Sequence, residues 1–121
     1  MQAIVHAIFY YSYRVQTDLP IIVWENMYFI EANDIEHAKH AMNAYLRELE
    51  DVSGNMECNG IPSDYRFAGI RKIILVEETD IQQSAAFLNK IEVTYSVYEV
   101  RSHADILALA EGRSVNLVYQ E

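Results

Sequence analysis

The sequence predicts an α+β fold, with an antiparallel or mixed β-sheet of about five strands and one long helix packed on it. Segments 3–15, 21–32, 65–78 and 92–100 are rich in β-branched and aromatic residues, which is typical of strands. Segment 35–49 has apolar residues at steps of three and four, which indicates a helix. The expected order is β-β-α-β-(α)-β-α-β. The length of 121 residues favours a single domain spanning 1–121.

The first two strand-like runs are "AIVHAIFYYSYRV" and "IIVWENMYFIEA", and only "QTDLP" separates them. Asp18 and Pro20 are turn-forming residues, so the linker favours an antiparallel hairpin. The two runs are therefore expected to lie side by side in the sheet.

The stretch "FYYSYRV", residues 9–15, raises the question of whether its aromatic rings bind a ligand or pack in the sheet. Alternation places Phe9, Tyr11 and Tyr13 on one face of the strand and Tyr10 on the other. The face that also carries Val5, Ala7 and Val15 is the better candidate for the core. We expect the rings to pack on the sheet, with Tyr10 or Tyr13 reaching a partner protein.

The long helix is expected to begin at an Asn33 or Asp34 cap and to end near Ser53-Gly54. Segment 80–89 is expected to form a short helix or turn. Segment 103–112 is expected to form a short helix that stops at Gly112, and "SVNLVYQ" could close the sheet.

The charge of −9, from 18 acidic and 9 basic residues, excludes several classes of partner. Phosphate backbones and anionic membranes attract lysine and arginine, so no nucleic acid and no membrane is expected to bind. A basic protein partner is compatible with this charge. The single cysteine, Cys58, forms no intrachain disulfide, and the first residues do not resemble a signal peptide, so a cytoplasmic location is expected.

Recognised catalytic and cofactor motifs are absent from the sequence. His37 and His40 lie at helical spacing, but no third ligand follows at a defined distance, so no metal and no cofactor is expected. His6 and His103 are each expected to be structural. The chain is therefore predicted not to be an enzyme.

Acidic residues crowd the expected C-terminal end of the long helix, where the helix dipole favours cations. We interpret Glu48, Glu50, Asp51 and Glu57 as an acidic patch for a basic partner. The alternative is that bases of the neighbouring strand, Arg66, Arg71 or Lys72, neutralise these carboxylates.

The run "YRFAGIRKIILVEE", residues 65–78, resembles a motif of a small bacterial family of domains of unknown function, an aromatic-x-Phe-x-Gly-(Val/Ile) strand with an acidic end. Tyr65, Phe67, Gly69 and Ile70 match it, although the family usually has Trp where this chain has Tyr65. The similarity extends loosely over residues 9–101, through "YSYRV", "ENMYFIEANDIEHAKHAMNAY" and "IEVTYSVYEV". It implies a bacterial or phage α+β domain and carries over no catalytic residues.

These observations favour a small acidic binding protein, most simply an immunity-type inhibitor that neutralises a basic toxin or nuclease-like protein. Its contacts would come from Glu48, Glu50, Asp51 and Glu57, with Tyr10 and Tyr13 as anchors. One alternative is a phage-encoded inhibitor of a host nucleic-acid-handling defence complex. Another is a small-molecule-binding or enzymatic domain, for which a pocket holding His6 or His103 beside carboxylates would be evidence. An edge strand could also pair two copies into a homodimer.

Overall fold

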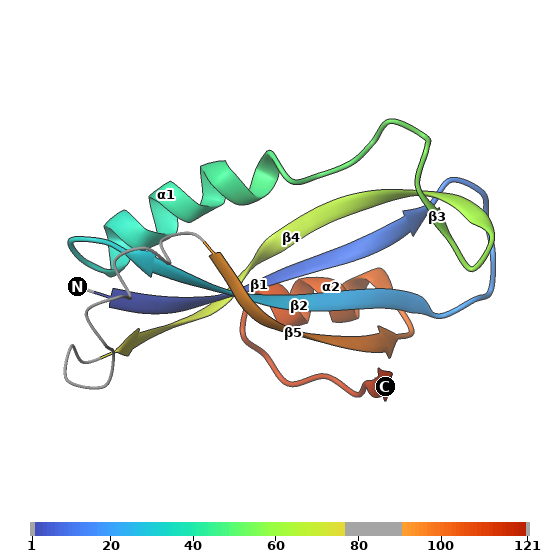
Figure 1. Cartoon of the computed structure of the whole chain (residues 1–121). Helices are drawn as coiled ribbons and strands as arrows, with labels where there is room; N and C mark the ends of the chain where they lie inside the picture. The colour runs from blue at the N-terminus through green and yellow to red at the C-terminus, as the bar shows by residue number, and fades with distance from the viewer. Residues whose placement is uncertain (1, 77–90, 121) are drawn as a thin grey trace.

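A computed structural model of the chain describes residues 2–76 and 91–120, and it shows one six-stranded antiparallel sheet with a short helix on each face (Figure 1). The strands are β1 (Gln2–Tyr13), β2 (Ile21–Glu31), β3 (Glu57–Cys58), β4 (Ile61–Val76), β5 (Ile91–Val100) and β6 (Val118–Gln120). The helices are α1 (Ile35–Arg47) and α2 (His103–Ala110). The strand order across the sheet is β3-β4-β1-β2-β5-β6.

The expected fold class was wrong in its proportions, because the molecule is mostly β rather than a five-strand sheet carrying one long helix. The expected long helix ends at Arg47, several residues before Ser53. The backbone N–H groups of the next residues, from Glu48 to Glu50, donate to the carbonyl three residues earlier rather than four, as in a 3₁₀ turn. The α-helix therefore ends here. Carboxylates at the negative end of a helix dipole favour this early end. The helix or turn expected at 80–89 lies outside the described residues.

The hairpin prediction is confirmed, because β1 pairs antiparallel with β2 from Gln2↔Glu31 to Tyr10↔Val23. Both faces of β1 are buried. Val5, Ala7 and Phe9 face the cluster that contains Ala38, Met42 and Leu46 of α1. Val15 lies beyond the strand and is exposed, so its assignment to the core was wrong.

The opposite face of β1 packs under α2, where Ile8 joins Ile106 and Leu109 in a second buried cluster. Successive residues of a strand point to opposite faces, so a strand buried on both sides needs a cover on each side. α1 and α2 provide these covers from opposite sides of the sheet (Figure 1).

α2 approaches the sheet at Gly69 of β4. A Cβ on this residue would lie 3.1 Å from the Cβ of Ala110, and the φ of +152° is strained for any other residue. The glycine therefore sets the distance between helix and strand.

We predict that Gly69→Ala lowers the free energy of unfolding by about 2–4 kcal/mol, from backbone strain and overpacking together. Urea denaturation followed by circular dichroism measures the loss. Adding Ala110→Gly removes the clash but not the strain, so the double variant should lose less than the two single variants summed. Strict additivity would show that the close packing does not contribute.

Candidate functional site

Five aromatic side chains from four strands lie on the α1 side of the sheet. Strand pairing places them together: Tyr11 is opposite Tyr65, and Phe9, on the same face, is opposite Trp24. Tyr95 is opposite Asn26, two residues beyond Trp24. We call this surface the aromatic face, defined by Tyr11, Tyr13, Trp24, Tyr65 and Tyr95.

The rings of the aromatic face contact one another in ordered pairs. Tyr65 stacks on the buried Phe9 ring at a centroid distance of 4.9 Å with an interplanar angle of 1°, and Tyr11 tilts against Tyr65 at 5.2 Å. Trp24 and Tyr95 lie 4.8 Å apart. The base of the surface is therefore part of the core, which holds the outer rings in place.

α1 lies over β4 and β1, so the rings nearer β5 remain accessible (Figure 1). Tyr95 is 55% exposed, and the other four rings are half-buried. Contiguous exposed aromatic surface on a small domain is typical of an interaction site.

Asn26 lies at one end of the aromatic face, opposite Tyr95 on β5, and is only 6% exposed. Its Nδ2 donates weakly to the hydroxyls of Tyr65 and Tyr28, at 3.4 and 3.5 Å. Its carboxamide oxygen has no donor among the described residues. An unpaired buried acceptor destabilises a fold by about 1–3 kcal/mol, so a bound donor would relieve this penalty.

Two carboxylates flank the aromatic face. Glu92 is opposite Tyr28, and Glu99 is opposite Ile22, which places both on the same side of the sheet as Asn26. Burial raises the pKa of Tyr65 and of Tyr13, and the nearby negative charges of Glu92 and Glu99, respectively, add to these shifts. The surface thus combines aromatic rings with negative potential.

The two predicted anchor tyrosines lie on opposite faces. Tyr13 belongs to the aromatic face, where its hydroxyl donates to the Pro20 carbonyl at 3.0 Å and accepts from Asn59 Nδ2 at 2.9 Å. Tyr10 packs against the α2 cluster, with its ring edge-on to His103 at 5.6 Å. The two side chains therefore cannot contact one flat partner surface together.

The four predicted acidic residues do not form one patch of uncommitted carboxylates. Glu50 Oε2 accepts the backbone N–H of Phe67 at 2.9 Å. Asp51 accepts from the Ser53 hydroxyl and backbone N–H, and these hydrogen bonds hold its pKa below the usual 3.8. Glu48 and Glu57 are exposed, but they lie at the end of α1 and on β3, which a long loop separates (Figure 1).

The expected neutralising bases do not contact these acids. Arg66 pairs with Asp64, at 3.3 Å, and Arg71 Nη1 donates to the carbonyls of Leu109 and Arg113. Glu50 accepts a hydrogen bond from the backbone and Asp51 accepts two from Ser53. Charge reversal at these two positions would therefore change the stability of the fold and not only binding. Glu48→Lys and Glu57→Lys are the substitutions that test binding.

A buried polar cluster on the α2 side was not predicted from the sequence. His6 Nδ1 donates to Glu25 Oε2 at 2.7 Å, and the Tyr98 hydroxyl donates to Glu25 Oε1 at 2.7 Å. The three residues come from β1, β2 and β5, so only the sheet register brings them together. Neither of the two pockets with a described lining includes His6 or His103.

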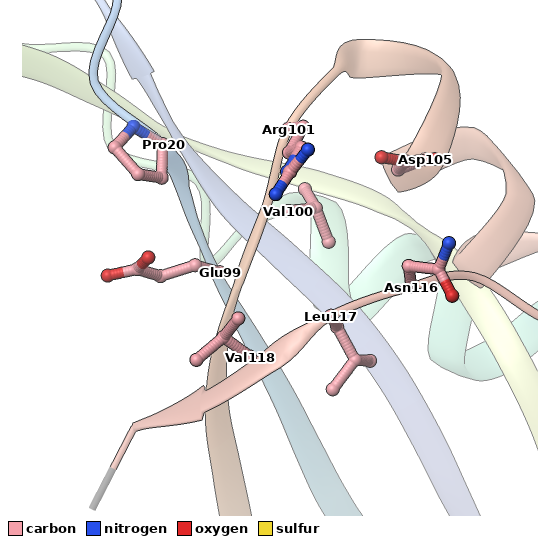
Figure 2. Close-up of a pocket in the computed structure, with 8 residues that line it drawn as sticks. All are labelled: Pro20, Glu99, Val100, Arg101, Asp105, Asn116, Leu117 and Val118. Atoms are coloured by element: carbon pink, nitrogen blue, oxygen red, sulfur yellow. The ribbon is translucent and has the colours of Figure 1, made fainter.

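A hollow of about 520 Å³ lies between β5, the start of β2 and the segment leading to β6. Figure 2 shows Glu99 on the Pro20 side of this hollow and Asp105 on the α2 side. Arg101 lies between them, so the lining mixes both signs of charge.

Within residues 2–76 and 91–120, no group of three or more His, Cys, Asp or Glu side chains is placed to hold a metal ion. No helix in this part of the chain is long and apolar enough to cross a membrane. No family model, no curated protein and no solved structure matches the chain.

We predict that Glu25→Gln lowers the free energy of unfolding at pH 7 by about 1.5–3 kcal/mol, because Glu25 accepts two hydrogen bonds in a largely buried position. Burial alone would raise its pKa, but the hydrogen bonds from Tyr98 and His6 lower it below the usual 4.5. The ionised carboxylate therefore stabilises the fold above pH 4.5, and this contribution disappears as the pH falls through the lowered value.

Urea unfolding at pH 7, 5 and 3 measures this dependence, with the exposed Glu57→Gln as control. The gap between wild type and Glu25→Gln should narrow towards pH 3, while the control stays near wild type. A gap that is constant with pH would contradict the stabilising role of the carboxylate charge.

Proposed function

We propose that this chain is a binding protein that captures a basic protein partner on its aromatic face, most simply as an immunity-type inhibitor of a basic toxin. The observation that carries the proposal is the set of five aromatic side chains on the α1 side of the sheet, with Glu92 and Glu99 on the same side. We further propose that it acts in the cytoplasm and is not an enzyme.

The chemistry of the aromatic face favours arginine and lysine side chains. Cations bind over Trp and Tyr rings, and tyrosine and tryptophan are enriched among residues that dominate interface energies. Tyr95, the most exposed of the five rings, is the one most open to such a contact. Glu92 and Glu99 would favour the incoming positive charge.

The same surface disfavours nucleic acid. Stacking platforms for single strands lie in positively charged grooves that follow the backbone. Here the flanking groups are carboxylates and the chain carries a charge of −9. The net charge would also speed association with a basic protein, by an amount that falls as salt is added.

Of the predicted contact residues, Tyr13 lies on the aromatic face, and Glu48 and Glu57 are exposed for a rim contact. The alternative function, a phage-encoded inhibitor of a host nucleic-acid-handling complex, would use the same contacts. Its target would also be a basic protein surface that binds phosphates. The two readings differ in the partner, and identification of that partner separates them.

We predict that Tyr95→Ser weakens partner binding by roughly 30-fold or more, because truncating a central aromatic contact removes about 2 kcal/mol. Immobilised protein is used to capture partners from native cells, mass spectrometry identifies them, and the purified basic partner is titrated by calorimetry. Tyr119→Ser is the matched control, because Tyr119 is 68% exposed but lies across the sheet beside Tyr98.

Wild-type protein and Tyr119→Ser should suppress the growth arrest caused by the partner, whereas Tyr95→Ser should fail. Equal binding by the two variants would overturn the aromatic face as the site. A dominant acidic partner, or a second copy of this chain, would overturn the proposed class of partner.

A further inference from the structure

The second described pocket has a charge opposite to that of the whole protein. It has a volume of about 450 Å³ and lies where the start of α1 and the end of α2 meet β4. Three bases line it, Lys39, Arg71 and Lys72, and one acid, Glu111. In the whole chain acids outnumber bases by 18 to 9, so this wall reverses the ratio.

The two lysines of this wall form no ion pair with an acid of the described residues, whereas the charge of Arg71 acts on Glu25. Glu111 is bound to Arg113 at 2.9 Å, a base outside the lining. Within the part of the chain that the structure describes, Lys39 and Lys72 form no ion pair, and both are exposed. A negative group entering the pocket would therefore meet two ammonium groups that form no ion pair with the described acids.

Arg71 occupies its position because β4 is bulged there. The pairing with β1 passes from His6↔Lys72 to Ala7↔Ile70, so Arg71 is the extra residue. Bulges redirect side chains and are frequent beside functional sites. Arg71 Nη1 donates to the carbonyls of Leu109 at 2.9 Å and Arg113 at 3.1 Å, which fixes the guanidinium at the end of α2.

The rest of the wall is apolar. Ile70 and Ile73 are half-buried on β4, and Ile35 at the start of α1 is 42% exposed. Pockets of roughly 300–1,000 Å³ with apolar walls and a few polar groups are typical small-molecule sites. Here three of the four charged groups are cations, and this excess of positive charge favours an anionic ligand.

We propose that this pocket binds a small amphipathic anion, with its carboxylate or phosphate at Lys39 and Lys72 and its apolar body on Ile35, Ile70 and Ile73. The fixed guanidinium of Arg71 adds positive potential from the α2 side. Both sites include residues of β4, Tyr65 in the aromatic face and residues 70–73 here, but they share no lining residue. Anion binding therefore does not depend on the proposed capture of a basic protein.

The test is a titration of the full chain followed by two-dimensional 1H–15N NMR with four probes. Hexanoate and hexyl phosphate carry the proposed chemistry and distinguish the two acidic groups. Hexyltrimethylammonium has the same apolar body with the opposite charge, and inorganic phosphate has the charge without the body. The alkyl anions should shift the amides of residues 70–73 and 110–111, and should bind at least tenfold more tightly than the other two probes.

Lys39→Gln/Lys72→Gln should raise the Kd of the better anion by at least tenfold, and Arg101→Gln, which removes an exposed charge at the other hollow, should leave it unchanged. Matching spectra of the free variants establish that they fold. Equal binding of hexyltrimethylammonium, shifts that map away from β4, or an unchanged Kd in the double variant would each overturn the proposal. Tyr95→Ser should leave anion binding intact, so a negative result for one proposed site would not count against the other.

Discussion

The central constraint of this structure is that β1 is buried on both faces. Phe9 and Ile8 are adjacent in the sequence, fully buried, and part of different clusters. No single helix can cover both, so the fold needs α1 on one side and α2 on the other. A helix of 13 residues spans only about 20 Å, whereas 16 residues of strand span about 53 Å. The covers are therefore shorter than the sheet, and part of each face is left for other uses.

Buried polar side chains are hydrogen-bonded to different extents on the two sides of the sheet. Under α2, the Glu25 carboxylate accepts from both His6 and Tyr98, so a buried charge is fully engaged and ties three strands together. On the α1 side, Asn26 is as deeply buried, but one end of its amide is unpaired. The first arrangement stabilises the fold. The second leaves the buried Asn26 amide oxygen without a donor among the described residues.

Local signals predicted where the two helices begin and where the four longer strands lie, but not the end of α1 or the short strand β3. Asp34 accepts the His37 amide at 2.8 Å as the N-cap of α1, and Gly112 follows α2 with a positive φ, as the sequence indicates. The sequence could not assign the faces, because alternation in β1 shows two apolar sides without showing which helix covers each. The sequence also did not indicate that the rings of the aromatic face lie together. Trp24 and Tyr95 lie far apart in the chain, and only the β2–β5 register brings their rings to 4.8 Å. The sequence does not show that Glu50 accepts a hydrogen bond, because the donor is the backbone N–H of Phe67, on β4.

The two proposed sites also show why net charge is a poor guide to local binding. In physiological salt, interactions between exposed charges are screened beyond roughly 8 Å. A large basic partner spans many such lengths and responds to the excess of carboxylates over much of the surface. A small anion within the pocket is closest to the residues that line it, which include Lys39, Lys72 and Arg71. A chain with a charge of −9 can therefore attract a basic protein on one surface and hold an anion on another. The large partner interacts with charges over much of the surface, whereas the small anion interacts mainly with the charges that line its pocket.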